Sequence, residues 1–138
     1  MATPTLDEFL GKLVGDLGAT VSAALVGIGD RLGLYKALAG SSGLTPAGLA
    51  ARTGTDERYV REWLCAQAAA GYVDYDAASG AFFLNEVQTL AFADDSSPAH
   101  FLGGFQVARA MFKDMDTVID AFRTGRMSTL CPGRRKGS

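Results

Sequence analysis

Residues 44–84 have the sequence LTPAGLAARTGTDERYVREWLCAQAAAGYVDYDAASGAFFL, and this stretch decides the fold. Thr45, followed by a proline, is a helix start signal, because a hydroxyl caps the first turn and proline fits its first position. The short helix stops near Gly54, and a longer helix, opened by Thr55, ends at Gly71. A short helix, a turn containing glycine and a longer helix predict a helix-turn-helix.

Two aromatic-rich runs follow directly, YVDY at residues 72–75 and AFFL at residues 81–84. The five residues between them include Gly80, so the pattern is typical of a β-hairpin. A helix-turn-helix followed by a hairpin is a winged helix. The sequence therefore predicts a mainly α fold with a small β-hairpin wing.

Further helices are expected on both sides of this winged helix. Residues 6–17 carry apolar side chains at steps of three and one, which predicts an amphipathic helix that Gly18 can end. A second helix is expected over residues 19–39, where Gly27 and Gly29 weaken the helix but permit close packing of a neighbour.

The chain after the wing is also rich in helix formers. A short helix is expected from Asn85 or Glu86 to Phe92. From Pro98 onward, apolar residues at steps of three and four predict either one long helix or two with a break near residues 113–114. An isolated winged helix cannot cover all these apolar helix faces, so we expect them to be buried as flanking dimerisation helices in a homodimer.

Length and composition bound the remaining possibilities. The 138 residues suit one domain, which we place at residues 1–125 with a net charge of −6, and a basic tail at 126–138 with a net charge of +4. We expect the tail to be disordered. Two cysteines do not make a disulfide scaffold. The sequence contains no uninterrupted run of 18 apolar residues, so no membrane span is predicted. The acidic N-terminus does not read as a secretory signal, so a cytoplasmic protein is expected.

Three pieces of the chain resemble a known family: LGLYKALAG at 32–40, LTPAGLAARTGTDERYVREWLCAQAAAGYV at 44–73 and GAFFLNEVQTLAF at 80–92. They resemble the N-terminal winged-helix dimerisation domain of class I S-adenosylmethionine (SAM)-dependent, O-methyltransferase-like enzymes. Bacterial members of this kind are often labelled transcriptional regulators. The likeness extends over residues 6–125, most of the chain.

The resemblance implies that dimerisation and catalysis belong to different domains. Members of the family continue into a Rossmann-like catalytic domain, where a strand and a Gly-rich loop hold SAM. The glycines of this chain lie inside helical patterns and follow no predicted strand. We therefore expect a non-catalytic dimerisation and substrate-lid module, with no catalytic, cofactor-binding or metal-binding residue. Methyl transfer would require a catalytic domain joined to it.

Candidate ligand and DNA contacts follow from two helices. An aromatic and Met-rich stripe after residue 100 suggests an apolar pocket or lid with one cation, since ligand sites are mostly apolar. Its candidate lining residues are Phe101, Phe105, Arg109, Met111 and Phe112. The alternative function is a stand-alone winged-helix transcriptional regulator, in which a small apolar effector binds between the helices and Arg52, Arg58 and Arg61 contact DNA. Interleaved acids give residues 56–62 a net charge of −1, which disfavours DNA.

The single histidine and the two cysteines do not indicate a catalytic or metal site. His100 is the only histidine and has no partner in a motif, so a structural or exposed residue is expected. Cys65 is expected to be a small buried hydrophobe, and Cys131 belongs to the tail. One histidine and two distant cysteines do not have the spacing of a metal site.

Overall fold

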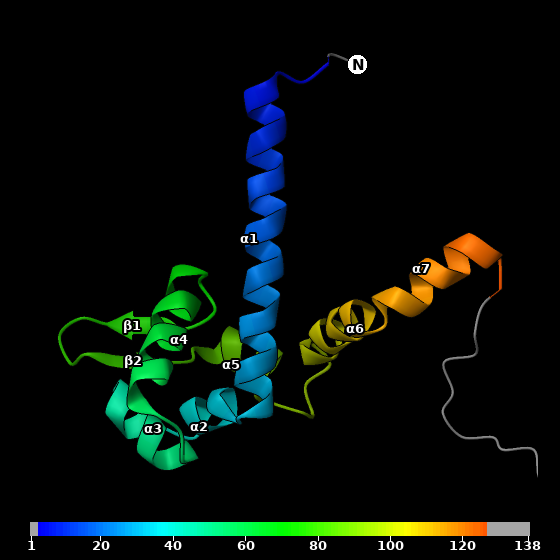
Figure 1. Ribbon diagram of the computed structural model, residues 1–138. Helices are drawn as coiled ribbons and strands as arrows, with labels where there is room; N and C mark the ends of the chain where they lie inside the picture. Colours follow the sequence, from blue (N-terminus) through cyan, green and yellow to red (C-terminus); the bar gives the residue numbers. More distant parts are fainter. Residues whose placement is uncertain (1–2, 127–138) are drawn as a thin grey trace, which may run out of the picture.

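The computed structural model describes residues 3–126, and their elements follow the order of a winged helix with flanking helices (Figure 1). The elements are α1 (Leu6–Arg31), α2 (Leu34–Ala39), α3 (Pro46–Thr53), α4 (Glu57–Ala69), β1 (Asp74–Asp76), β2 (Ala81–Phe83), α5 (Glu86–Phe92), α6 (Leu102–Lys113) and α7 (Met115–Thr124). The fold class predicted from the sequence is confirmed. Apart from Arg126, the predicted tail lies outside the described residues.

Helices α3 and α4 form the helix-turn-helix, and their caps explain where they begin. The Thr45 hydroxyl accepts a hydrogen bond from a first-turn amide of α3, and Gly54 ends that helix at φ +66°. The cap of α4 is Asp56 rather than the predicted Thr55. The carboxylate accepts from two backbone amides at the positive end of the helix, whereas the Thr55 hydroxyl pairs with that of Thr53 at 2.7 Å.

The wing is a short antiparallel hairpin that is joined to the start of α3. Tyr75 on β1 lies opposite Phe82 on β2, and the two rings are 4.6 Å apart. The backbone of Phe82 also exchanges two hydrogen bonds with Leu44, at 2.8 and 2.9 Å. This bridge fixes the wing beside the helix-turn-helix.

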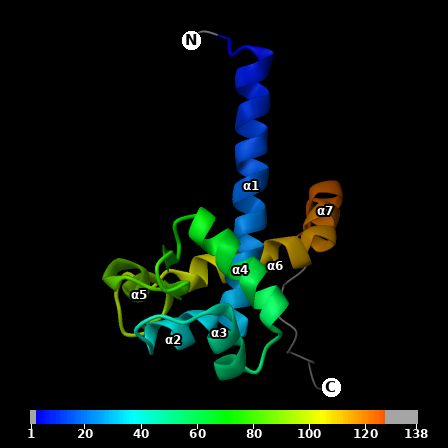
Figure 2. The ribbon, with the colours of Figure 1, turned by 90° about the vertical axis from the view of Figure 1, so that its left-hand side faces the viewer.

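One helix, α1, replaces most of the two helices predicted before the winged helix. Gly18 lies inside α1 and does not end it, so that prediction was wrong. The chain breaks instead at Gly33, whose φ of +69° lies in the left-handed region, and α2 begins directly after it. The N-terminal half of α1 stands clear of the other elements in both views (Figures 1 and 2).

The region after the wing contains two helices, α6 and α7, with the break at Asp114. The first of them begins at Leu102, because the residues after Pro98 still belong to a loop. Leu102 is the buried residue of α6, while α7 has none. Figure 1 shows α6 beside the C-terminal half of α1 and α7 extending away from the body.

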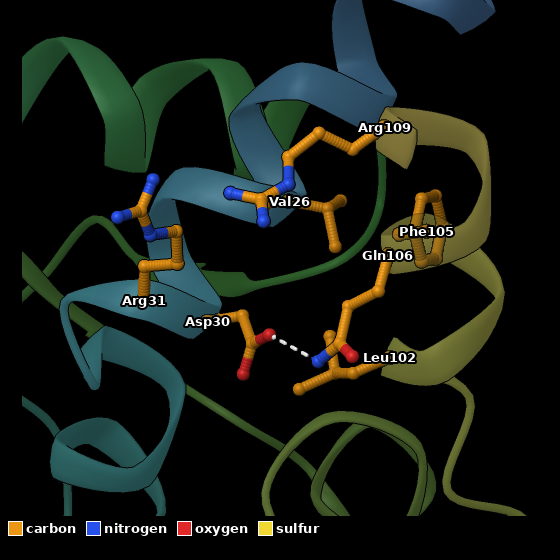
Figure 3. A pocket seen from close by; sticks show the side chains of 8 residues that line it. Val26, Asp30, Arg31, Leu102, Phe105, Gln106 and Arg109 are labelled. Carbon is orange, nitrogen blue, oxygen red and sulfur yellow. Dashed lines mark hydrogen bonds between the residues drawn. The ribbon is translucent and has the colours of Figure 1, made fainter. Parts of the chain in front are cut away.

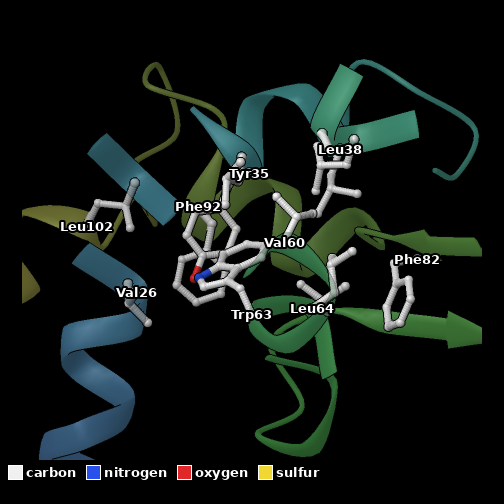
Figure 4. Packing of buried hydrophobic residues seen from close by; sticks show 13 residues of the cluster. Val26, Tyr35, Leu38, Val60, Trp63, Leu64, Phe82, Phe92 and Leu102 are labelled. Carbon is white, nitrogen blue, oxygen red and sulfur yellow. The ribbon is translucent and has the colours of Figure 1, made fainter. Parts of the chain in front are cut away.

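The core lies where α2, α3, α4, α5, the wing and the C-terminal half of α1 meet, and Leu102 of α6 also belongs to it (Figure 4). The ring of Tyr35 stacks on Phe92 at 4.8 Å and meets the edge of Trp63 at 5.1 Å. Its hydroxyl donates a hydrogen bond to Gln67, which is fully buried. Burial raises the pKa of the Tyr35 hydroxyl, so the group remains a neutral donor.

Trp63 fixes α1 to the winged helix. Its Nε1 donates a hydrogen bond to the Leu25 carbonyl at 2.8 Å. A Cβ atom placed on Gly29 would lie 2.3 Å from the Trp63 ring, so only glycine permits this approach. Gly29 therefore has the close-packing role that the sequence predicts for both glycines, whereas Gly27 faces open space.

Candidate functional site

The C-terminal half of α1 and helix α6 border an apolar groove that is partly open to solvent. Phe105 and Phe112 line it from α6, and three small or β-branched residues and one threonine line it from α1. The cavity measures about 360 Å³, which is within the range of small-molecule sites, roughly 300–1,000 Å³. The α1 side consists of Thr20, Val21, Ala23 and Ala24.

A second pocket, with more polar lining than the groove, continues toward the end of α1 and measures about 240 Å³ (Figure 3). Gln106 Nε2 donates a hydrogen bond to the Asp30 carboxylate at 3.0 Å. Arg31 and Arg109 also line this pocket, and Arg109 reaches from α6 toward α1. Arg109 lines the apolar groove as well, so it stands where the two cavities meet.

The structure places the predicted ligand-lining residues in two groups. Phe105, Arg109 and Phe112 line the groove. Phe101 packs edge-on against Phe105 at 6.0 Å and is 64% exposed, while Met111 is 69% exposed, and neither lines the two cavities. Spacing along α6 could identify its inner face. The α1 side of the groove carries Val21 together with two alanines and a threonine, and the alanines and the threonine gave no signal in the sequence.

The predicted DNA contacts lie in different surroundings. The Arg52 guanidinium donates to the carbonyls of Ala37 and Gly40 and so caps the end of α2. Arg61 forms an ion pair with Glu57 at 2.6 Å. Arg58 is exposed on α4. Two of the three candidate arginines therefore have partners within the chain.

His100 and Cys65 do not form reactive clusters. His100 Nε2 lies 3.7 Å from the Asp95 carboxylate, which also accepts a hydrogen bond from Lys36 at 2.6 Å. The hydrogen bond between Lys36 and Asp95 lowers the pKa of Asp95 and raises the pKa of Lys36. Cys65 is exposed, so the expectation of a buried hydrophobe was wrong: it lines a surface pocket between α4 and the wing. Within residues 3–126, no group of three His, Cys, Asp or Glu residues is placed to hold a metal ion.

The N-terminal half of α1 presents an apolar stripe. Every residue from 6 to 21 is exposed. The stripe includes Leu6, Phe9, Leu10, Leu13, Val14, Leu17 and Val21. Over an 18-residue window the mean hydropathy of α1 is 1.4, so by length and composition this helix could also cross a membrane.

The winged helix matches a family by sequence: residues 20–93 match the Rv2258c-like winged HTH domain. The chain belongs to this family. No curated protein matches the chain. Within residues 3–126, the one sheet is the two-stranded wing, so the parallel sheet of a Rossmann-like domain is absent from this part.

Solved methyltransferase structures have the same fold as this winged helix and its flanking helices. An O-methyltransferase family protein from Burkholderia thailandensis has a TM-score of 0.70 at 18% identity, over 91% of this chain and 35% of its own. PigF with SAH has a TM-score of 0.66 at 19% identity, over 88% and 38%. CalO1, a methyltransferase in calicheamicin biosynthesis in its SAH-bound form, has a TM-score of 0.58 at 28% identity, over 97% and 37%. This chain spans little more than a third of the length of these neighbours.

Proposed function

We propose that this chain is a non-catalytic assembly module of a SAM-dependent methyltransferase, in which α1 joins two copies and α6 covers a small apolar ligand. The observation that carries the proposal is the apolar stripe on α1, whose residues 6–21 are all exposed. A solitary helix is marginal in water, and a large exposed apolar patch usually marks an interface.

The spacing of the stripe favours a second copy of the same helix as its partner. Apolar pairs recur with the seven-residue period of paired helices. Within the stripe they are Leu6 and Leu13, Leu10 and Leu17, and Val14 and Val21. Identical helices with such a repeat can bury the same stripe against each other, as a two-fold symmetric dimer requires.

The charge of α1 argues for a protein partner over a membrane. Helices that lie on membranes are typically rich in lysine and arginine on their polar face. The exposed half of α1 carries Asp7, Glu8 and Asp16 against the single cation Lys12. The likeness to methyltransferase chains supports a soluble protein, and we place it in the cytoplasm.

The described residues do not fit SAM. Its adenosine and charged sulfonium part would need a strand, a Gly-rich loop and a helix in succession. Gly11, Gly15 and Gly18 lie within α1, and Gly103 and Gly104 lie within α6. Their amides belong to helices rather than to an open loop. In this proposal, the cofactor and the methyl transfer belong to a catalytic domain joined to this module.

Hydrogen exchange over α1 tests the dimer. If the stripe is buried between copies, amides of residues 6–21 are protected in the wild-type chain. Protection is lost when Leu13→Asp and Leu17→Asp are combined, because two charges would enter the interface. Ala19→Asp is the control: it places one aspartate on the opposite, exposed face of α1 and leaves protection intact. Rapid exchange over residues 6–21 in the wild-type chain would refute the pairing.

The transcriptional-regulator alternative gains no observation from the structure. Its candidate arginines are largely paired within the chain, and the interleaved acids of α4 remain exposed. Fluorescence anisotropy with mixed-sequence duplexes separates the two functions. We expect no binding at physiological salt, and binding at low salt that Arg58→Ala leaves unchanged. Tight binding that Arg58→Ala weakens would favour the regulator.

A further inference from the structure

We propose that the α1–α6 groove binds an amphipathic anion: a planar apolar body with one carboxylate or similar acidic group, held at the acidic end by Arg109. This inference deepens the proposed ligand-covering role and rests on it. It adds the charge of the ligand and the residue that recognises it.

The shape of the groove argues for a flat apolar body. Two aromatic rings, Phe105 and Phe112, face it from α6. Opposite them, the α1 side offers Thr20, Val21, Ala23 and Ala24, whose side chains are shorter than the rings and leave space between the helices. Large rings on one wall and small side chains on the other leave a slot, which a planar molecule fills with the most contact.

The charge at the end of the slot argues for an acidic group. Arg109 lies at the junction of the apolar groove and the polar pocket. The five ion pairs found within residues 3–126 involve neither Arg109 nor Arg31, which lines the same pocket. A guanidinium offers several fixed donors, which match the two oxygens of a carboxylate.

Asp30 is the acidic residue among those that line this pocket. Its carboxylate accepts a hydrogen bond from Gln106, which holds it on the α1 wall. Two arginines and one aspartate leave the pocket with one net positive charge. A ligand anion is therefore attracted, whereas a ligand cation would meet both guanidinium groups.

The test uses the full chain and two probes that share the naphthalene ring, 2-naphthoate and the uncharged 2-naphthalenemethanol. Each is titrated while backbone amide signals are followed by NMR. We expect naphthoate to shift the signals of residues 20–31 and 102–113, with an affinity about tenfold or more above that of the alcohol, the size of a charge-assisted hydrogen bond. Added salt should reduce this difference, because the pocket is partly open to water.

Three variants assign the effect. Arg109→Gln is expected to bring naphthoate down to the affinity of the alcohol. Phe112→Ala should weaken both probes alike, because it removes part of the apolar wall. Arg58→Gln, which removes an exposed arginine from α4, is the matched control and should change neither. Equal binding of both probes, or a naphthoate affinity that Arg109→Gln leaves unchanged, would overturn the inference.

The same samples separate this inference from the proposed dimer. Light scattering gives the mass of each titrated sample. A dimer that binds naphthoate no better than the alcohol overturns the anion site and leaves the assembly role standing. A monomeric chain that binds naphthoate through Arg109 supports the site and refutes the assembly role.

Discussion

Replacing Gly29 by alanine tests how α1 is attached to the winged helix. The added Cβ would lie 2.3 Å from Trp63 Cζ2 and 2.7 Å from Tyr35 Cε2. Carbon atoms in contact lie about 3.5–4.0 Å apart, so the clash amounts to roughly an ångström or more. Neither ring is free to move, because Trp63 donates a hydrogen bond to the Leu25 carbonyl of α1 and Tyr35 is stacked on Phe92.

Three contributions to the free energy of unfolding change in Gly29→Ala, and they do not all have the same sign. Overpacking a core typically destabilises by about 1–3 kcal/mol. Loss of the Trp63 hydrogen bond would add about 1 kcal/mol. Alanine is the better helix former and returns about 1 kcal/mol. We therefore expect Gly29→Ala to lower the free energy of unfolding by about 2 kcal/mol.

Gly27→Ala is the matched control, because a Cβ there meets no atom within 4 Å. Helix propensity alone should then stabilise the protein by up to about 1 kcal/mol. Urea unfolding followed by circular dichroism measures both variants, at one fixed protein concentration because dimerisation contributes to stability. A Gly29→Ala variant at least as stable as Gly27→Ala would refute this packing argument.

Two further predictions concern polar contacts. Asp74 accepts hydrogen bonds from the side chains of Asn85 and Gln88, both at 3.0 Å. Asp74→Ala should therefore lower the free energy of unfolding in urea by about 1–2 kcal/mol. An unchanged urea midpoint would show that the wing needs no such link to α5. The Ser96 hydroxyl and amide lower the pKa of Asp94 below its ordinary 3.8, so the ionised form stabilises the fold above that pH. The advantage of wild type over Asp94→Asn should therefore shrink as pH falls below 3.8, and thermal melts across pH in which it stays constant would contradict this.

Local signals in the sequence predicted the winged helix well. Thr45 and Gly71 mark the outer ends of the helix-turn-helix because capping and left-handed glycine are decided within one turn of chain. Gly18 and Gly33 show the limit of such signals. Both follow an apolar periodic run, but only Gly33 adopts a positive φ, and the packing of α2 against the core determines which one breaks the helix.

The site was only half predictable for a similar reason. The spacing of Phe105, Arg109 and Phe112 places them on one face of a helix, so sequence alone could group them. Ala23 and Ala24 on the opposite wall have no chemistry that identifies a site. Their role depends on how α6 packs against α1, which is a contact between segments about eighty residues apart.

The mass of the chain in solution tests the central claim, that α1 joins two copies, most directly. Sedimentation equilibrium over a range of concentrations should give twice the 14.4 kDa of one chain, and the monomer should appear only on dilution. The variant with Leu13→Asp and Leu17→Asp should remain monomeric at concentrations where Ala19→Asp is dimeric. A folded wild-type chain with the mass of a monomer at every concentration would contradict the account.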